Sequence, residues 1–469
     1  MAGKKLSVFD AFFLAAETRE AMMHVGGLLV FTPPADAHPQ LLRHLADELR
    51  ASAAVYAPWN LRLWTPELLK NPLQAWIEEP SVDLEYHVRR SALPAPGDER
   101  ELGILVSRLH SVPIDFHRPP WEVHFIEGLE GGRFAMYFKI HHALVDGYTS
   151  MKLLARSLAD DPDDRDTPMF FARPPRPRVV TEELEVEAVP TFERVLASVR
   201  GSLGATREAG RAIMNVVRAS RAGDRTLVAP MGAPRTMINR RISRNRRFAT
   251  QQYPIERLRA LARASGGTIN DVALAVCGGA LRRYLAEHDG LPAEPLTAML
   301  PVNIRPKDDP GGGNAVGAIL CTLATDLEEP AARLAAVITS TRRAKEQLAG
   351  LSRSAIMQYS AALMAPLAMQ QVPTANSWMR PAFNVVVSNV PGPEQPLYFR
   401  GARLDALYPL SIPYHGQGLN ITINGYAGTI NVGFTGCRDA VPSLQRLAVY
   451  SGDEVAALER ELAVTAQAG

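Results

Sequence analysis

The chain has 469 residues, of which 46% are hydrophobic and 21% charged, and this composition is typical of a globular protein with a large core. The formal net charge of +2, without interleaved basic and aromatic residues, excludes nucleic-acid binding as a first expectation. Three cysteines, Cys277, Cys321 and Cys437, are far apart and lack a CxxC spacing, which argues against a disulfide framework or a zinc cluster and favours a reducing, cytoplasmic setting.

The first part of the chain alternates helical and strand signals and ends in the stretch FAMYFKIHHALVDG. Apolar residues occupy every second position from Phe134 to Ile140, which predicts a strand with one apolar face. If this strand continues, His142 extends the apolar row and points inward, whereas His141 points to the opposite face. Asp146 and Gly147 then predict a turn.

The composition changes after about residue 159. The stretches DDPDDRDTP and ARPPRPRVV combine like charges with prolines and predict a linker, and a helical pattern from Pro190 to Ala222 predicts a crossover helix. We therefore predict an N-terminal half over residues 1–165, a linker and crossover helix over 166–228, and a C-terminal half over 229–469.

The second half opens with six crowded arginines between Arg235 and Arg247, which form either a solvated loop or a surface that recognises phosphate groups on a cofactor or an anionic membrane. Two helices are then predicted around Gly266 and Gly267. Strand patterns in LTAMLPVNIRP, AVGAILCTLAT, FNVVVSNVPGP and GLNITINGYAGTINVGFTG predict a fold of mixed α/β type.

The longest uncharged run of interest extends from Ser354 to Met379. Its length is sufficient to span a bilayer, but its polar residues, together with Pro366 and Pro373, argue against a spanning helix. We expect a buried helix, or one that lies against a lipid surface.

Four explanations compete for HHALVDG. A metal site is disfavoured because neighbouring histidines on opposite strand faces cannot easily converge on one ion. A serine hydrolase requires a GxSxG elbow, which the chain lacks. Two alternatives remain: a structural histidine followed by an Asp-Gly turn, and a neutral imidazole that acts as a general base towards a hydroxyl. In the second, Asp146 fixes the loop that carries His142, with Arg305 as its first candidate partner.

HHALVDG resembles the HHxxxDG motif of acyl-CoA-dependent acyltransferases related to chloramphenicol acetyltransferase. Over nearly its whole length, the chain resembles the bacterial wax ester synthase/diacylglycerol acyltransferase family. The matching pieces follow the family's order: LSVFDAFFLAAET, MHVGG, RPPWEVHFIEGLEGGRFAMYFKIHHALVDG, TINDVALAVCGGALRRYL, LPVNIRP, GNAVG and VVVSNVPGP.

The resemblance implies two chloramphenicol-acetyltransferase-like halves, each a mixed sheet with helices, flanking a central tunnel. It implies an O-acyltransferase that moves a long-chain acyl group directly from acyl-CoA to diacylglycerol, to a long-chain alcohol, or to both. The resemblance further implies that the enzyme requires no metal and no cofactor, and that acyl-CoA is a co-substrate. The lipid acceptor implies a cytoplasmic protein associated peripherally with the inner face of the membrane or with lipid droplets.

The resemblance also implies roles for residues. His142 is the expected general base, and His141, Asp146 and Gly147 belong to the same motif, with Asp146 as structural support. Five residues are expected at the substrate: Trp121, Asn270, Asp271, Ser388 and Asn389. Asn270 and Asp271 also suit a helix start, and the Asn-Val-Pro-Gly-Pro turn suits the segment after Ser388.

One position departs from the family, which usually has Pro-Leu-Trp where this chain has Pro119, Pro120 and Trp121. A proline ring with fixed φ in place of an apolar side chain puts an inferred chain-length preference in doubt. Three rival interpretations remain: another acceptor, such as a polyketide-derived diol or a carrier-bound substrate; a non-catalytic lipid-binding protein of the same fold; and Cys277 as a nucleophile. We expect Cys277 to be a packed core thiol.

Overall fold

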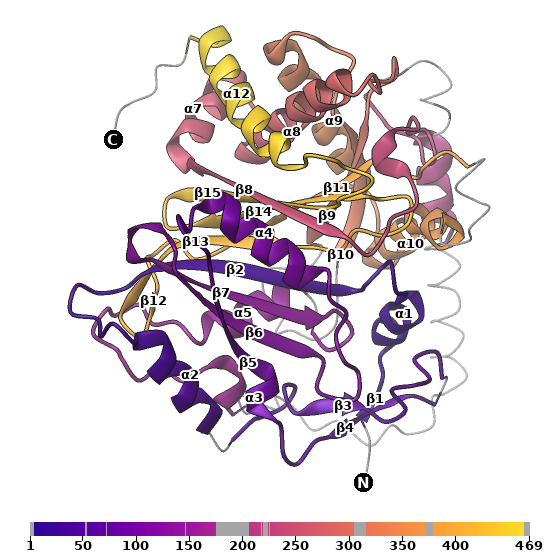
Figure 1. Ribbon diagram of the computed structural model, residues 1–469. Coiled ribbons are helices and arrows are strands. Elements are labelled where there is room, and N and C mark those ends of the chain that lie inside the picture. The colour runs from indigo at the N-terminus through magenta and orange to yellow at the C-terminus, as the bar shows by residue number, and fades with distance from the viewer. Residues whose placement is uncertain are drawn as a thin grey trace. The chain divides into compact units, whose positions relative to one another are not determined.

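The structure is a computed structural model. It describes all residues except 1–3, 52–53, 72, 146, 175–205, 217, 219–223, 225, 304–315, 371–378 and 464–469. The chain divides into two compact units (Figure 1). Unit 1 comprises Met1–Pro175, Arg241–Arg257 and Asn389–Val449, and unit 2 comprises Arg176–Arg240, Leu258–Ser388 and Tyr450–Gly469. The late segment 389–449 therefore packs with the N-terminal part of the chain.

Unit 1 contains a six-stranded sheet in the order β12-β13-β2-β7-β6-β5. Its strands are β12 (Tyr398–Phe399), β13 (Ala402–Leu410), β2 (His24–Thr32), β7 (Phe134–His141), β6 (Trp121–Glu127) and β5 (Val88–Ala92). Neighbouring strands are antiparallel, except that β5 runs parallel to β6. The register places His24 opposite His141 across β2 and β7.

The remaining elements of unit 1 surround this sheet. Strands β14 (Leu419–Tyr426), β15 (Thr429–Cys437) and β8 (Arg246–Pro254) pair antiparallel in that order, and β1 (Lys4–Lys5), β4 (Ala75–Glu78) and β3 (Leu61–Leu63) form a small sheet. The helices are α1 (Val8–Ala16), α2 (Leu41–Ala51), α3 (Leu84–His87), α4 (Glu99–His110) and α5 (Gly147–Ala155).

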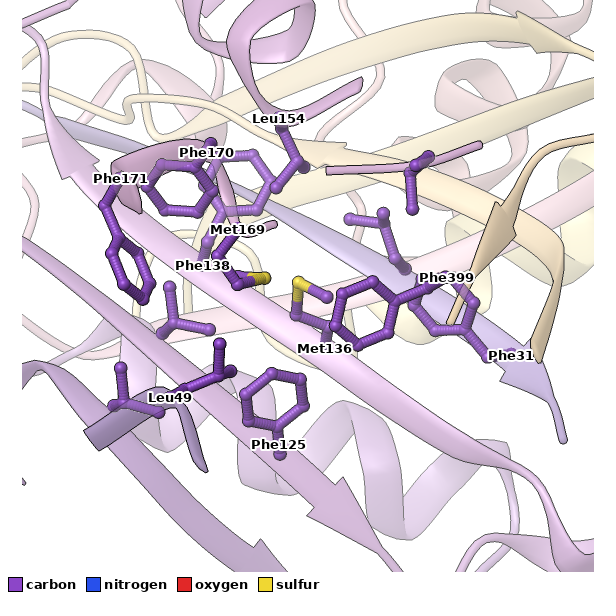
Figure 2. Packing of buried hydrophobic residues seen from close by; sticks show 14 of the residues in the cluster. Phe31, Leu49, Phe125, Met136, Phe138, Leu154, Met169, Phe170, Phe171 and Phe399 are labelled. Carbon is purple, nitrogen blue, oxygen red and sulfur yellow. The ribbon is translucent and has the colours of Figure 1, made fainter. Parts of the chain in front are cut away.

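The predicted strand from Phe134 is confirmed, but both of its faces are buried. The row that contains Phe138 packs into one core cluster (Figure 2), and Tyr137 packs into another. The first cluster also contains Phe171, which lies within the segment predicted as a linker, and its ring stacks on Trp121 with a centroid distance of 5.3 Å. Alternation alone could not predict that the second face is buried, because that face contains Lys139. The ammonium of Lys139 is buried and donates hydrogen bonds to the carbonyls of Leu109 and Val112.

Unit 2 contains β9 (Thr297–Asn303), β10 (Val316–Thr322) and most of β11 (Val385–Val390). Strand β9 pairs antiparallel with β10 and parallel with β11. The helices are α7 (Ile255–Ser265), α8 (Ile269–Glu287), α9 (Pro330–Ala349), α10 (Arg353–Gln370) and α12 (Gln445–Glu461). Of these, α7 and α12 each begin in unit 1. The predicted helix pair is confirmed: α7 and α8 flank Gly266, whose φ of 67° favours glycine.

Two other predictions concern helices. The apolar run from Ser354 forms most of α10, and no helix among the described residues is long and apolar enough to cross a bilayer. Of the predicted crossover helix, residues 206–216 are helical. Most of the rest of that prediction lies outside the described residues.

Candidate active site

The HHALVDG motif joins the end of β7 to the start of α5. Strand β7 ends at His141, so the condition for strand alternation at His142 is not met, and the residues after His141 form a turn. Two backbone hydrogen bonds fix this turn: His142 N donates to Met23 O at 2.9 Å, and Leu144 N donates to His141 O at 3.0 Å. The direction of His142 is therefore determined by the turn and by its contacts, rather than by strand alternation.

His141 is buried, and a hydrogen bond holds one of its two ring nitrogens. Its Nδ1 accepts a hydrogen bond from Ala143 N at 3.2 Å, so the proton of the neutral ring lies on Nε2. This Nε2 lies 3.4 Å from a carboxylate oxygen of Glu17. The edge of the Phe116 ring closes one side at a centroid distance of 4.9 Å. His141 thus serves as a structural anchor for the turn.

His142 is half-buried, unlike its neighbour. Its imidazole stacks on the ring of Phe13, with a centroid distance of 3.9 Å and an interplanar angle of 26°. This stacking restricts rotation of the imidazole, and partial exposure leaves the ring accessible. Of the two histidines, His142 therefore has the environment that a base acting on a bound substrate needs.

Glu17 is a site residue that the sequence analysis missed. It caps the C-terminus of α1, where Glu17 N donates to Phe13 O at 3.1 Å, and its carboxylate accepts a short hydrogen bond from Met23 N. One N-terminal segment thus contacts both motif histidines. Phe13 and Met23 contact His142, and Glu17 contacts His141. The available signal is the N-terminal match LSVFDAFFLAAET, which contains Phe13 and Glu17.

A buried arginine lies near this segment. Arg246 donates to Glu20 O and to Ser243 O, each at 2.6 Å. Burial lowers the pKa of Arg246 to about 10, while the neighbouring Cys437 and Glu17 side chains oppose this shift. The guanidinium therefore remains positive at neutral pH.

A buried ion pair precedes the motif on the same strand. Lys139 on β7 faces Glu122 on β6, with 3.3 Å between Nζ and the carboxylate, and His124 lies 3.2 Å from the same carboxylate. Burial raises the pKa of Glu122, but the His124 hydrogen bond and the charges of Lys139 and Arg89 lower it to about 2. This network ties β6 to β7 two residues before His141.

Gly147 was predicted to permit a tight turn in which a side chain would be crowded, but it is the first residue of α5 and this reason is wrong. A Cβ at this position would meet nothing within 4 Å, and its φ is not positive, so crowding does not require glycine there. Asp146 and its candidate partner Arg305 both lie outside the described residues.

Trp121 lies in the core. Its indole N–H donates to Trp59 O at 2.7 Å, and its ring stacks on His87 at a centroid distance of 4.4 Å. The unusual Pro120 lies directly beside the motif, because its carbonyl accepts from His141 N at 3.0 Å. The Pro-Pro-Trp departure therefore lies next to the histidine pair.

Asp271 has the predicted capping role, through a capping box with Thr268 as the N-cap. Its carboxylate accepts from Thr268 N at 2.9 Å and from the Thr341 hydroxyl at 2.6 Å. Asn270 is half-buried in the first turn of α8. Both residues lie in unit 2, and their expected contact with substrate stays a prediction.

Ser388 and Asn389 lie on β11, where Ser388 is half-buried and Asn389 is exposed. The residues that follow, Pro391 to Pro393, line a pocket against α5. The turn segment therefore lies next to the helix that begins at the histidine motif. Contact of Ser388 and Asn389 with substrate stays a prediction.

Two further expectations concern reactive and charged residues. Cys277 is a buried thiol on α8, and burial raises its pKa to about 12, which supports the packed thiol over the nucleophile. In the arginine-rich segment, Arg235 donates to Met379 O at 2.8 Å, and Arg246 is buried. Both arginines hold the fold through hydrogen bonds to backbone carbonyls, although Arg235 is exposed, as are Arg240 and Arg244.

Comparison with solved structures places the chain in a class. The first condensation domain of the calcium-dependent antibiotic synthetase has a TM-score of 0.58 and 19% identity, covering 99% of this chain and 97% of that chain. The wax ester synthase/diacylglycerol acyltransferase from Marinobacter aquaeolei has a TM-score of 0.76 and 36% identity, covering 98% of this chain and all of that one (100%). The fold class, mixed sheets with helices, is therefore that of the chloramphenicol-acetyltransferase-like acyltransferases, and the protein is an enzyme of this class.

Sequence comparison identifies the family. The wax ester synthase/diacylglycerol acyltransferase catalytic domain matches residues 6–273, and the C-terminal domain of the same family matches residues 312–459. A Mycobacterium tuberculosis relative, provisionally named a diacylglycerol O-acyltransferase, is 52% identical over 99% of this chain and 98% of its own length. The O-acyltransferase WSD of Acinetobacter baylyi is 38% identical over 98% of each chain. The chain belongs to the wax ester synthase/diacylglycerol acyltransferase family.

Proposed function

We propose that the enzyme transfers a long-chain acyl group from acyl-CoA to the hydroxyl of a lipid alcohol. With diacylglycerol the product is triacylglycerol, and with a long-chain alcohol it is a wax ester. The observation that carries this proposal is the half-buried His142 imidazole, oriented by Phe13 within the stretch that matches the catalytic domain of the family.

In the proposed reaction, His142 removes the proton of the acceptor hydroxyl. The oxygen attacks the thioester carbonyl carbon, a C–O bond forms, and the C–S bond breaks when the tetrahedral intermediate collapses. The imidazolium then returns its proton to the departing thiolate of CoA. Each step is a proton or acyl transfer between substrates and one imidazole, so the proposal includes no cofactor and no covalent acyl-enzyme.

The other motif residues have supporting roles in this proposal. His141 anchors the turn through Ala143 N and Glu17. Asp146 supports the loop, and Gly147 begins the helix that follows. Trp121, Asn270, Asp271, Ser388 and Asn389 are proposed to shape the substrate site, Trp121 from the core beneath the motif.

The acceptor class leads to a proposal about location. Diacylglycerol and long-chain alcohols partition into lipid, so the enzyme must reach a lipid surface to bind them. We propose peripheral association with the inner face of the membrane or with lipid droplets, with the exposed Arg240 and Arg244 as candidate contacts for anionic headgroups. Flotation with anionic vesicles at low salt tests this. Absence of flotation would remove the arginines as a docking site.

The proposed activity is tested by CoA thiol release from palmitoyl-CoA, with hexadecanol and with dipalmitoylglycerol supplied separately. The expected result is thiol release that depends on an acceptor, with the matching ester found in the lipid extract. The ratio of the two rates ranks the acceptors. Thiol release that is equal with and without either acceptor would contradict transfer to a lipid alcohol.

A further inference from the structure

A pocket of about 220 Å³ lies within unit 1, between α5 and the loop 391–397. Its walls are mainly apolar. The aliphatic residues that line it are Leu29, Leu154, Ala155, Leu158, Leu397 and Leu407. An apolar cavity of about 150 Å³ is already large enough to bind benzene. The pocket therefore has room for a segment of hydrocarbon chain.

One wall of the pocket contains a buried polar group. Asn424 is 1% exposed, and its Nδ2 donates to Val390 O at 2.9 Å. Its Oδ1 is buried and has no hydrogen-bond partner among the described residues. The residue opposite on β15, Asn431, is satisfied, because its Oδ1 accepts from Gln252 Nε2 at 2.8 Å.

The wall that carries Asn424 is fixed in place. Besides the Asn424 bond, Ala427 N donates to Pro393 O at 3.0 Å and Leu397 N donates to the Tyr426 hydroxyl at 2.8 Å. A Cβ on Gly392 would lie 2.2 Å from Gly425 O, so glycine is needed for this close approach. The loop therefore cannot move towards β14 to fill the space, and the pocket is preformed.

A buried acceptor without a partner is uncommon in native proteins and requires a reason. Here the residue that carries the acceptor lines an apolar space against α5, the helix that begins in the histidine motif. A ligand that fills this space with aliphatic groups and presents one O–H or N–H donor would satisfy both features of the pocket.

We propose that this pocket is a substrate subsite that binds an aliphatic segment with one hydrogen-bond donor, and that Asn424 Oδ1 accepts that hydrogen bond. The proposal rests on the proposed function, since two of its substrates have this chemistry. A lipid alcohol offers its hydroxyl, and the pantetheine arm of acyl-CoA offers amide N–H groups. The experiment distinguishes these two sources.

The test is calorimetric titration of the full chain with three probes: octanol, octyl methyl ether and pantetheine. The ether matches octanol in length but has no donor. If the subsite takes an alcohol, the wild type binds octanol about tenfold more tightly than the ether, and Asn424→Leu removes this preference. If it takes the pantetheine arm, Asn424→Leu instead weakens pantetheine binding by about the same factor.

Two further variants separate binding from folding. Ala155→Leu fills the pocket and leaves the three hydrogen bonds of the wall intact, so it is expected to weaken whichever probe Asn424 recognises. Asn431→Leu is the matched control, because it removes a buried asparagine from the paired strand without lining the pocket. Binding of all probes that is unchanged in both Asn424→Leu and Ala155→Leu would overturn the subsite.

The titration does not require turnover, so the two proposals fail separately. If wild-type protein shows Asn424-dependent binding but no acceptor-dependent thiol release, the subsite stands and the proposed function fails. If thiol release is normal and neither pocket variant changes probe binding or the KM of either substrate, the function stands and the subsite fails.

Discussion

The carboxylate of Glu17 lies 3.4 Å from Nε2 of His141, and it also accepts a hydrogen bond from Met23 N. Met23 O in turn accepts from His142 N at 2.9 Å. A single N-terminal carboxylate thus connects the anchored histidine to the backbone that positions the proposed base. Glu17 and His141 both lie within the stretch 6–273 that matches the catalytic domain of the family.

Glu17→Gln is expected to lower kcat substantially while leaving KM for acyl-CoA nearly unchanged, because the turn that positions His142 loses its charged support. A displacement of about 1 Å at a catalytic group can cost about 100-fold in rate. Steady-state thiol release measures both constants, and Glu17→Asp should recover part of the loss. An unchanged kcat in a Glu17→Gln protein of wild-type melting temperature would show that this contact does not position the base.

Phe13→Leu is expected to lower kcat because the His142 imidazole loses the ring on which it stacks. The adjacent Phe12 supplies a matched control, since it is 57% exposed and lies on the same helix. Phe12→Leu should therefore turn over at the wild-type rate. Equal losses in both variants would indicate a general effect on α1 rather than an effect on the imidazole.

Lys139→Met is expected to destabilise the fold by about 3–5 kcal/mol, because it leaves the Glu122 carboxylate buried without its principal cation. Chemical denaturation at neutral pH measures this loss. Lys345→Met is the control, because Lys345 is exposed on α9. A loss below about 1 kcal/mol, the range of surface ion pairs, would contradict the buried pair.

The same pair predicts a pH dependence. The pKa of Glu122 falls from 4.5 to about 2 on folding. A carboxyl with a depressed folded-state pKa contributes stability that is fully present above the unfolded pKa and is lost as the pH falls through the folded one. The contribution should therefore be complete above about pH 4.5 and disappear towards pH 2. Denaturation series from pH 6 to pH 2 measure the free energy of unfolding at each pH. The slope of this free energy against pH should be smaller for Glu122→Gln than for the wild type.

Asp271→Ala is expected to destabilise the protein by about 1–2 kcal/mol, because the capping box of α8 is broken and the Thr341 hydroxyl loses its acceptor. Thr268→Ala breaks the same box and provides the comparison. If Asp271 serves the helix alone, the two variants should lose kcat in proportion to their stability. A much larger loss of kcat in Asp271→Ala than in Thr268→Ala would support the expected contact with substrate.

Local patterns predicted much of the fold. Alternation located β7, and helical periodicity with a glycine pair located α7 and α8, because these signals depend on neighbours in sequence. The end of β7 at His141 was not predicted, since it depends on a hydrogen bond from His142 to Met23. Burial of the second face of β7 was not predicted either, because a lysine in a strand pattern indicates an exposed face. Lys139 is buried because it pairs with Glu122 on the neighbouring strand.

The candidate site was predicted in part. The motif singled out the histidine pair, but Glu17 and Phe13 are distant in sequence, and only the fold brings them to the motif. The acceptor on Asn424 could not be predicted, because an asparagine in a strand pattern gives no sign of whether its oxygen is satisfied. Cys277 was correctly interpreted, since its apolar helical surroundings already predicted an inert thiol.

The central claim is that His142 is the general base. The most direct measurement is acceptor-dependent CoA thiol release by His142→Ala, compared with the wild type and with His44→Ala, which removes an exposed histidine on α2. Loss of a general base is expected to lower kcat by about 100- to 10,000-fold, while His44→Ala keeps the wild-type rate. A folded His142→Ala protein that retains near-wild-type turnover would contradict the account and leave HHALVDG as a structural turn.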